Sequence, residues 1–408
     1  MQNKFVMKAI VASLAVAGMS AGISPVFAQA KISDNVVKIG ILTDLSGVYS
    51  DLAGNGSVIA AKLAVEEMGG KVLGMPVEVI SADHQNKPDV AANLARNWFD
   101  QDKVDMIADM PTSSTALAVM EIARQKNKMT MLSSAGATAV LAEKCSPTNI
   151  QWTFNTYALA ASTAKALLKE GKKKWYFITA DYTFGHSLEK DATEVIGANG
   201  GEVVGSSRHP FPGNDFSAYL LKAQSSKADV IALANAGADT INAVKQAKEF
   251  GISGKQTIAP LLTYVSDVHS MGLAKAQGMY LTEAFYWNQD EQARAWSKKF
   301  FEKAKRMPTS AQAGVYSAVL NYLKAIQAAG TDDAPAVVAK IKTMTINDAV
   351  IRNGKLRDDG ALIHDMLLLQ VKKPAESKQP WDYYNVKSVM RGSDVYPAPN
   401  SACSLVKK

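Results

Sequence analysis

Apolar stretches of strand length alternate with amphipathic stretches of helix length along the first third of the chain. The apolar stretches cover residues 36–44, 76–83, 104–110 and 129–135, and GSVIAAKLAVEEMGG, which follows the first of them, has the period of an amphipathic helix. Strands that are joined through helices run parallel, because a parallel pair needs a long crossover connection. The pattern therefore predicts an α/β lobe built on a parallel sheet.

The same alternation starts again near residue 174, which predicts a second doubly wound α/β lobe. Three helical stretches follow it and need a sheet to cover, and the nearest incomplete sheet is that of the first lobe. We therefore expect the chain to cross between the lobes near Asn155, Glu283 and Leu356, forming a hinge beside a cleft. The second set of apolar stretches is 174–181, 201–209, 228–236, 256–262 and 278–286, and the late helices are 289–306, 311–329 and 333–343.

The first 30 residues have the features of a secretory signal peptide. Lys4 and Lys8 give a positive start, residues 9–17 form a short apolar core, and small residues allow cleavage after Ala28 or Ala30. The apolar core is far shorter than the roughly 20 residues of a membrane span. No cysteine lies near the cleavage site to accept a lipid. We expect an exported protein that is free in the periplasm.

Cleavage after residue 30 leaves 408 − 30 = 378 residues, a length that suits two domains. The removed segment holds two lysines and no acid, so the formal charge falls from +7 to +5. The basic residues are scattered, and the densest run, 172–174, is typical of a solvated helix end. Nucleic-acid binding is therefore not expected.

The chain has two cysteines, Cys145 and Cys403, in a compartment that oxidises thiols. We expect them to form a disulfide that joins the C-terminal tail to the N-terminal half. The alternative is redox catalysis, which the chain disfavours because it has no CxxC spacing.

Four consecutive hydroxyl residues, Thr112, Ser113, Ser114 and Thr115, stand where a buried strand leads into a helix. One hydroxyl is enough to cap a helix, so capping alone leaves three unexplained. The carboxyl ends of parallel strands share one edge of the sheet, which places this run beside SSAGAT at 133–138. Amide groups at a helix start attract anions, and hydroxyls can complete such a site. The run therefore indicates carboxylate binding, with capping as the alternative.

The sequence contains none of the common enzyme motifs. Dinucleotide-binding and phosphate-binding glycine loops, the nucleophile elbow and the zinc-protease helix are all missing from it. No two histidines stand at the spacing of metal ligands. We expect no enzymatic activity, no cofactor and no metal; an exported α/β enzyme would need one of these features. The histidines are His84, His186, His209, His269 and His364.

Several segments, in their order along the chain, resemble those of type I periplasmic binding proteins of the branched-chain amino-acid ABC transporter family. The resemblance covers roughly 36–373 and implies a two-lobed α/β protein that closes on a small molecule and delivers it to an inner-membrane permease complex, as a monomer. The segments include VVKIGILTDLSGVYSDLAGNGS, ADHQNKPDVAANLARNW, DMPTSSTALAV, SSAGATAVL, ITADYTFGHSLEKD and GNDFSAYLLKAQSS.

The resemblance also implies the bounds of the lobes and the residues of the site. Lobe 1 would hold 31–154 with 286–355, and lobe 2 would hold 155–285 with 356–384, leaving 385–408 as a tail that the disulfide fixes to lobe 1. The ligand carboxylate would be held by Thr112, Ser113 and Ser114 together with Gly136, Ala137 and Thr138. Aromatic residues would cover the ligand, unless they serve core packing only: Tyr49, Tyr182, Phe184 and Trp287.

One position departs from the amino-acid binders of this family, which place an acid after the lobe 2 strand ending in APLLTY. This chain has Leu261 and Leu262 there, and Asn235 and Ala236 nearby are uncharged. A buried ammonium without an acceptor costs at least a few kcal/mol. Asp239 is the nearest substitute, although it also stands where a helix N-cap belongs. We therefore expect a small carboxylate without an α-ammonium, such as a short oxo acid or an aromatic acid.

Two other functions stay open at this point. The first is binding of a branched-chain or other hydrophobic amino acid, with Asp239 as the acceptor of its ammonium. The second is a sensory ligand-binding domain, because sensors share this fold. The signal peptide argues against a cytosolic regulator, and the lack of a membrane-spanning stretch in the sequence argues against a receptor.

Overall fold

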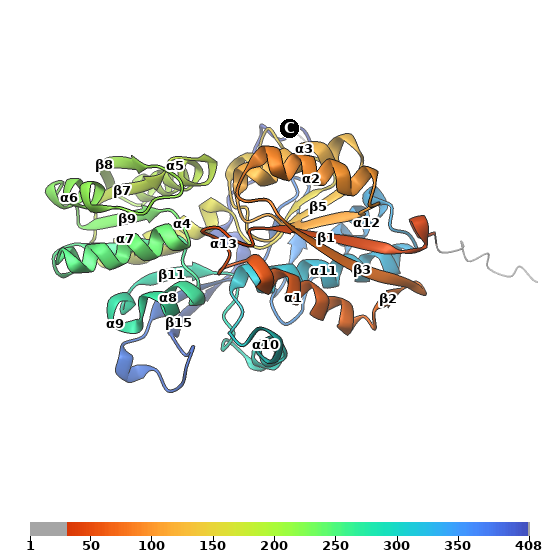
Figure 1. Cartoon of the computed structure of the whole chain (residues 1–408). Coiled ribbons are helices and arrows are strands. Elements are labelled where there is room, and N and C mark those ends of the chain that lie inside the picture. Colours follow the sequence, from red (N-terminus) through yellow and green to blue (C-terminus); the bar gives the residue numbers. More distant parts are fainter. Residues whose placement is uncertain (1–30, 407–408) are drawn as a thin grey trace, which may run out of the picture.

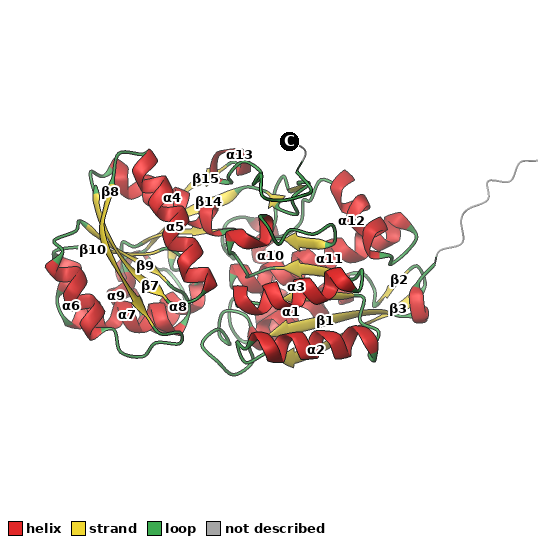
Figure 2. Cartoon of the chain, turned by 90° about the horizontal axis from the view of Figure 1, so that it is seen from above, coloured by secondary structure: helices red, strands yellow, loops and turns green. Residues whose placement is uncertain are grey.

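The computed structural model describes residues 31–406. The chain forms two α/β lobes that lie side by side, each with helices on both faces of a central sheet (Figures 1 and 2). The predicted fold class, two doubly wound parallel-sheet lobes, is confirmed. The predicted signal peptide lies outside the described residues.

The lobe 1 sheet has six strands in the order β2-β3-β1-β4-β5-β6. β2 and β3 form an antiparallel hairpin, and the other neighbours are parallel. The carboxyl ends of β1, β4 and β5 therefore meet at one edge, which faces lobe 2. The strands are β1 (Val37–Thr43), β2 (Lys71–Val72), β3 (Met75–Asp83), β4 (Met106–Asp109), β5 (Met129–Leu132) and β6 (Asn149–Gln151).

Helices from two distant parts of the chain cover the lobe 1 sheet (Figure 1). α1 (Gly54–Glu67) packs against α11 (Ser310–Ala329) on one face, and α2 (Pro88–Asp100) packs against α3 (Ser113–Gln125) on the other. α10 (Glu291–Ala304) contacts α1, and α12 (Ala334–Thr343) contacts α11. The late helices therefore complete lobe 1, as the pattern predicted.

The lobe 2 sheet has four parallel strands in the order β10-β9-β7-β8. Alternate side chains of β7 pack on opposite faces: Trp175 and Phe177 lie in one apolar cluster with α4 and α5, and Tyr176 and Ile178 lie in the other with α6 and α7. The elements are α4 (Thr156–Lys169), β7 (Lys174–Ala180), α5 (Thr183–Ala198), β8 (Glu202–His209), α6 (Ser217–Ser225), β9 (Val230–Ala234), α7 (Ala238–Glu249), β10 (Thr257–Pro260), α8 (Val265–Met271) and α9 (Leu273–Ala276).

A third sheet, antiparallel, lies next to lobe 2 and has the order β11-β14-β15. A separate hairpin of β12 and β13 stays with lobe 1, because Gln151 at the end of β6 bridges Ala361. The boundary proposed between residues 355 and 356 falls inside β12, so the third passage to lobe 2 lies nearer His364. The strands are β11 (Tyr280–Glu283), β12 (Lys355–Leu356), β13 (Leu362–Ile363), β14 (Met366–Val371) and β15 (Tyr384–Met390).

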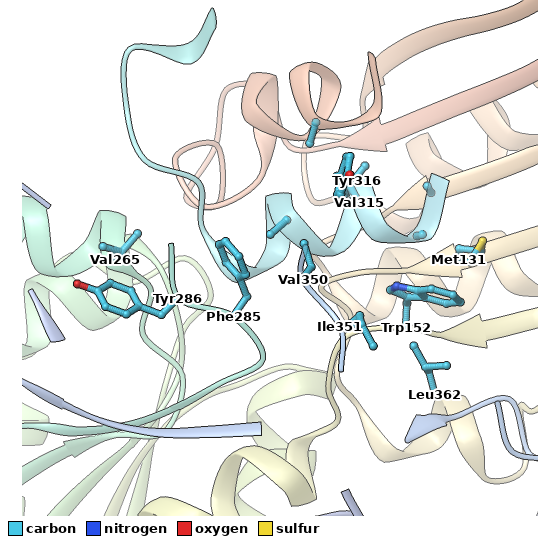
Figure 3. Packing of buried hydrophobic residues seen from close by; sticks show 14 of the residues in the cluster. Met131, Trp152, Val265, Phe285, Tyr286, Val315, Tyr316, Val350, Ile351 and Leu362 are labelled. Carbon is cyan, nitrogen blue, oxygen red and sulfur yellow. The ribbon is translucent and has the colours of Figure 1, made fainter. Parts of the chain in front are cut away.

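Buried apolar side chains fill the region where the connecting segments meet lobe 1. Phe285, Val350 and Ile351 come from those segments and belong to the same buried cluster as Val315 of α11 (Figure 3). Trp152, just after β6, donates a hydrogen bond from its indole nitrogen to the Ser317 hydroxyl at 3.0 Å. The base of the hinge is therefore anchored to the longest helix of lobe 1.

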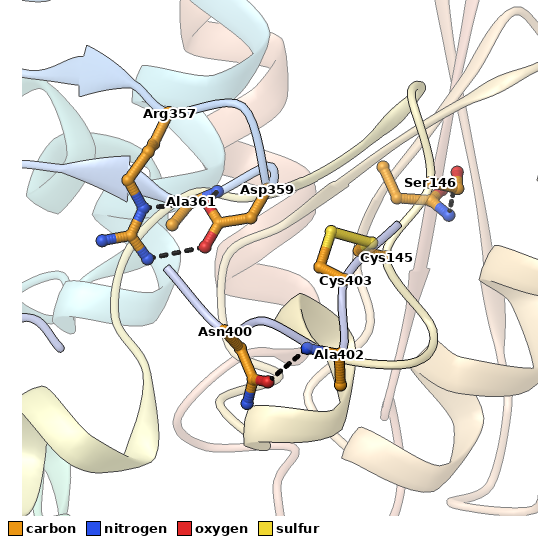
Figure 4. Close-up of a disulfide and its surroundings, with 9 residues drawn as sticks. Cys145, Ser146, Arg357, Asp359, Ala361, Asn400, Ala402 and Cys403 are labelled. Atoms are coloured by element: carbon orange, nitrogen blue, oxygen red, sulfur yellow. Dashed lines mark hydrogen bonds and ion pairs between the residues drawn. A yellow bond between two sulfur atoms is a disulfide. The ribbon is translucent and has the colours of Figure 1, made fainter. Parts of the chain in front are cut away.

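The predicted disulfide is confirmed: Cys145 in lobe 1 is bonded to Cys403 in the tail (Figure 4). The tail starts within lobe 2, since β15 pairs with β14, and passes through α13 (Gly392–Val395). Beyond α13, Tyr396 donates its hydroxyl to the Thr153 carbonyl at 3.2 Å. The tail therefore connects the two lobes a further time. On the loop-entropy model, its disulfide contributes about 4–5 kcal/mol to the stability of the folded protein.

Four short 3₁₀ helices complete the structure, at Ser33–Asn35, Thr138–Leu141, Ile252–Gly254 and Pro374–Glu376. Over residues 31–406, no helix combines the length and the apolar composition that a membrane span requires.

Candidate ligand-binding site between the lobes

A small cavity with about 10 Å³ of free volume lies between the two lobes. This volume is about that of one water molecule, so a ligand needs the lobes or the lining side chains to move apart. The residues around it are mostly aromatic or aliphatic, and none of these described side chains carries a formal charge at neutral pH. They are Tyr49, Leu52, Pro111, Ser134, Tyr182, Phe184, Ala236, Leu262 and Tyr264.

Every segment that lines the cavity follows the carboxyl end of a parallel strand. Lobe 1 contributes the segments after β1, β4 and β5, and lobe 2 contributes those after β7, β9 and β10. Ligands of open α/β sheets bind at this edge because the chain turns there from strands into helix N-termini. Both sheets therefore present their ligand-binding edges to the same cavity.

The two lobes touch each other directly across the cavity. The hydroxyl oxygens of Tyr49 and Tyr182 are 2.6 Å apart, and Phe211 stacks on Tyr182 with ring centroids 4.2 Å apart. Gly237 lets the backbones approach closely, because a Cβ at this position would lie 2.6 Å from the Val48 carbonyl oxygen. The structure is therefore that of closed lobes.

Burial sets the protonation state of the bridging tyrosines. It raises the pKa of the Tyr49 and Tyr182 hydroxyls well above the usual range, so both stay protonated. One of the two hydroxyls donates to the other. The hydrogen of the accepting hydroxyl is not used in this bond, so it is available to another acceptor at this boundary of the cavity.

The run of four hydroxyls does not cap α3. Thr112 occupies the N-cap position but makes no side-chain cap hydrogen bond; its hydroxyl donates to the Asn86 side-chain oxygen instead. Thr115 donates back to the Thr112 carbonyl at 2.6 Å. Capping, the alternative explanation of this run, is therefore wrong. The first turn of α3 therefore has no side-chain cap among the described residues.

In the second predicted anion-binding segment, residues 136–138, two backbone amides are already used in hydrogen bonds within the protein. The Ala137 amide donates to the Ser113 hydroxyl oxygen at 3.3 Å, and the Thr138 amide donates to the Ser187 hydroxyl oxygen of lobe 2 at 2.8 Å. The Thr138 hydroxyl donates to Asp191 at 2.6 Å. Thr138 thus joins the lobes, at the edge of a separate hollow between them.

Comparison with known proteins assigns the chain to a family. A family model described as periplasmic binding protein matches residues 36–378. The chain belongs to the periplasmic binding protein family. It is therefore the substrate-binding component of an ABC transporter and not an enzyme.

Solved structures and curated relatives agree with this assignment. A periplasmic binding protein from Burkholderia mallei is 48% identical, with a TM-score of 0.89, over 91% of this chain and 100% of that chain. A branched-chain amino-acid ABC transporter periplasmic ligand-binding protein from Burkholderia xenovorans LB400 is 42% identical, with a TM-score of 0.82, over 90% and 99%. A Leu/Ile/Val-binding protein homolog 6 from Brucella melitensis is 28% identical, over 76% of this chain and 81% of the relative.

Asp109 is a buried carboxyl of this binding protein that the sequence analysis missed. It ends β4 with a φ of 81°, and Met110 follows with a φ of 56°, so two side-chain-bearing residues adopt a backbone that such residues rarely adopt. Strain of this kind concentrates at ligand sites. The signal in the sequence was an acid three residues before the hydroxyl run.

Hydroxyl groups surround the Asp109 carboxyl. Ser133 and Ser134 donate to its Oδ1 at 2.8 and 3.1 Å, and the hydroxyls of Thr43 and Ser57 also lie beside it. Burial raises the pKa of Asp109, and these hydroxyls oppose the rise by stabilising the charged form. A polar network therefore lies directly behind Ser134, which lines the cavity.

Asp239 does not cap α7, because Gly237 occupies the N-cap position and Asp239 lies in the first turn. Its Oδ1 accepts a hydrogen bond from the Gly213 amide at 3.0 Å, and its Oδ2 has no hydrogen-bond partner among the described residues. Burial raises the pKa of Asp239 to about 7. The N-cap explanation of this residue is therefore wrong.

The nearest basic group to Asp239 is His209, with Nδ1 3.9 Å from Oδ2. His209 donates from Nδ1 to the Pro210 carbonyl at 2.8 Å, while Nε2 accepts from the Asn235 side-chain amide at 3.1 Å. These two bonds suit the neutral imidazole, and burial lowers the pKa of His209. His209 is therefore not a countercharge for Asp239, and Asn235 is bonded to it rather than facing the cavity.

The structure brings four predicted site residues into the cavity lining, namely Tyr49, Tyr182, Phe184 and Ala236. Gly136 lies just behind it, since a Cβ there would be 3.4 Å from Phe184. Leu262 lines the cavity, whereas Leu261 is buried beside it. Trp287 lies elsewhere, with its indole nitrogen donating to the Trp381 carbonyl at 2.7 Å.

Leu52, Pro111 and Tyr264 also line the cavity, and the sequence analysis named none of them. Over the described residues, no group of three or more His, Cys, Asp or Glu side chains is arranged to hold a metal ion.

Proposed function

We propose that this binding protein closes on a small carboxylate without an α-ammonium, a short oxo acid or an aromatic acid, and presents it to an inner-membrane permease complex. The observation that carries the proposal is the cavity lining, which offers aromatic and aliphatic surface and no charged side chain. A buried ammonium needs an acceptor, whereas an apolar body does not.

The anionic end of the ligand would dock at the lobe 1 edge. Pro111 lines the cavity and leads into the first turn of α3, which carries amide donors and the hydroxyls of Ser113 and Ser114. Neither serine lines the cavity in the closed form, so the carboxylate would meet them as the lobes close around it. The partial positive charge of a helix N-terminus favours a carboxylate at this point. The rings of Tyr182 and Phe184 would cover the apolar part from lobe 2.

Closure is the functional step in this proposal. A ligand shifts the balance from open to closed lobes only as far as it binds the closed form better, so it must contact both lobes. Closure also removes water, which strengthens each hydrogen bond to the carboxylate. Tyr49 and Tyr182 meet across the cavity in the closed form.

Titration calorimetry with leucine, valine, 2-oxoisocaproate, acetoacetate and benzoate tests the proposal. We expect at least one of the acids to bind with a dissociation constant in the micromolar range, about 8 kcal/mol of binding free energy. Tight binding of leucine with no binding of any acid would overturn it. A thermal melt of the protein with each ligand serves as an independent readout, because a ligand that binds only the folded state raises the melting temperature.

Binding of a hydrophobic amino acid is the second candidate, and one observation favours it. Asp239 lies close to Tyr49 and Tyr182, and its Oδ2 has no hydrogen-bond partner among the described residues. A charged Asp239 would accept an ammonium. Leucine binding that disappears in Asp239→Asn would support this candidate, whereas acid binding that survives the substitution would support the first.

The cellular setting completes the proposal. The first 30 residues would act as a signal peptide cleaved after Ala28 or Ala30, and the mature protein would work as a free monomer. A solute-binding protein of R. palustris that shares the fold, at 20% identity and a TM-score of 0.80, was solved in complex with benzoate. It shows only that this fold can enclose an aromatic acid.

A further inference from the structure

Ser134 is the one aliphatic hydroxyl in the cavity lining, and its hydrogen is directed away from the cavity. The residue follows β5 and is 4% exposed. Its hydroxyl donates to Asp109 Oδ1 at 3.1 Å. Ser133, whose oxygen is 3.4 Å from that of Ser134, donates to the same carboxylate oxygen at 2.8 Å.

These bonds fix which hydrogen-bonding role Ser134 can play toward a ligand. A serine hydroxyl has one hydrogen and two lone pairs. The hydrogen of Ser134 is used inside lobe 1, in the bond to Asp109 Oδ1. The cavity therefore meets the lone pairs of Ser134, and a ligand atom beside them must bring its own hydrogen.

We propose that Asp109 fixes Ser134 as a hydrogen-bond acceptor, so that this binding protein selects carboxylates that carry a hydroxyl beside the carboxylate over the corresponding oxo acids. The inference rests on the proposed function, the binding of a carboxylate without an α-ammonium, and favours hydroxy acids over oxo acids within that class. Asp109 acts here as a positioning residue, and Ser134 makes the contact.

The position of Ser134 determines how far the ligand's hydroxyl donor lies from the ligand's carboxylate. Pro111 and Ser134 line the cavity together, and Pro111 leads into the first turn of α3, where the carboxylate is proposed to dock. A group that reaches Ser134 is therefore close to the carboxylate. A carbonyl oxygen at this place would face lone pairs and leave a buried acceptor unpaired, which costs affinity.

Matched pairs of ligands test the rule on the unaltered mature protein. The probes are 2-hydroxyisocaproate against 2-oxoisocaproate, and mandelate against phenylglyoxylate, measured by titration calorimetry with leucine as a third ligand. In each pair that binds, we expect the hydroxy acid to bind about tenfold more tightly, the effect of one satisfied buried hydrogen-bonding group. Equal binding of the two members, or tighter binding of the oxo acid, overturns the rule.

Two neighbouring serines supply a matched pair of variants. Ser134→Ala removes the acceptor, and we expect the preference for the hydroxy acid to fall to within about twofold. Ser133→Ala removes a donor to the same carboxylate oxygen but is not part of the cavity lining, so the preference should stay near its original value. A tenfold preference that survives in Ser134→Ala overturns the role of Ser134.

The ligand pairs need no variant, so the rule stays testable even if Ser134→Ala fails to fold, which melting temperatures would show. Failure of the proposed function looks different from failure of this rule. Leucine binding with no binding of any acid would overturn the proposed function, whereas equal binding of both members of a pair would overturn the hydroxy-acid rule alone.

Discussion

The two sides of the cavity differ in the polar groups they contain and in how those groups are hydrogen-bonded. The lobe 1 side holds a buried carboxyl, Asp109, inside a network of hydroxyls, and it exposes Ser134 to the cavity. The lobe 2 side presents Tyr182, Phe184 and Leu262. One of its buried carboxyls, Asp239, has one backbone donor and lies behind the lining.

This difference indicates a division of labour between the lobes. A polar network whose members are bonded to one another holds its groups in fixed directions, so lobe 1 can read the polar end of a ligand before closure. Apolar surface recognises shape and excludes water but has no directional preference. Lobe 2 would therefore supply cover and shape selection, and three predictions test this division.

The largest expected effect comes from the contact that joins the two sides. Tyr49→Ala removes the hydroxyl bond to Tyr182 and the ring packing against Phe211, whose centroid lies 5.5 Å from that of Tyr49. We expect binding of the tightest acid in the calorimetry panel to weaken by about 100-fold, the loss typical of a buried aromatic contact. Calorimetry at one temperature and pH measures it.

Tyr49→Phe is the matched control for that change, because it keeps the ring and removes only the hydroxyl. We expect a loss of about fivefold, the value of one hydrogen bond. An affinity of Tyr49→Ala within a few fold of the unaltered protein would mean that closure does not depend on this contact, and the division of labour would have to be reconsidered.

The next effect concerns the polar side alone. The double substitution of Ser113 and Ser114 by alanine removes two hydroxyls from the proposed carboxylate site, and we expect acid binding to weaken at least tenfold. The melting temperature of the unliganded protein should fall only slightly, because neither hydroxyl caps α3 and the bond lost within the protein is the 3.3 Å one from the Ala137 amide to Ser113. Calorimetry and thermal melts measure the two quantities.

Thr115→Val serves as the control within the same run of hydroxyls. Its hydroxyl donates to the Thr112 carbonyl inside the helix, so its removal should leave affinity within about twofold. If the serine double variant lost as much free energy of unfolding without ligand as free energy of binding, the hydroxyl run would have a structural role. Lobe 1 would then not be the lobe that recognises the polar end of the ligand.

The smallest expected effect probes the carboxyl on the apolar side. The pKa of Asp239 is about 7 in the closed form, whereas an exposed aspartate titrates near 3.8. If opening exposes Asp239, closure takes up a proton, so acid binding should weaken by about tenfold as pH rises from 6 to 8. Affinities at pH 6, 7 and 8 measure this slope.

Asp239→Asn should remove most of that slope. The titratable groups that face Asp239 are His209, Tyr49 and Tyr182, and the latter two stay protonated over this range. His209 would contribute with the opposite sign, because burial lowers its pKa and closure then releases its proton. A slope that persists in Asp239→Asn would exclude Asp239 as its source.

Local patterns were sufficient for much of the fold. Periodicity located all four strands of the lobe 2 sheet and four of the six in the lobe 1 sheet, missing the short β2 and β6. The late helices were assigned to lobe 1 because they needed a sheet to cover. The disulfide followed from two cysteines in an oxidising compartment. The third passage between the lobes was placed too early, because the β12–β13 hairpin gives no signal in the sequence that it stays with lobe 1.

The site was harder to predict than the fold. The strand ends were found, and Tyr49, Tyr182, Phe184 and Ala236 do line the cavity. Asp109 was overlooked because its hydroxyl partners, Ser133 and Ser134, lie some 25 residues further along the chain. Trp287 was placed near the ligand by the family resemblance, whereas its indole is bonded to the Trp381 carbonyl, far along the chain.

By itself, the sequence determined two parallel α/β lobes, their hinge and an edge rich in hydroxyls, because strand and helix periods and turn chemistry are local properties. The tertiary structure decided which hydroxyls form hydrogen bonds only within the protein and which one lines the cavity. It also decided that Asp239 is buried without capping a helix. These outcomes depend on contacts between residues distant in sequence, and many of them form only where the closed lobes meet.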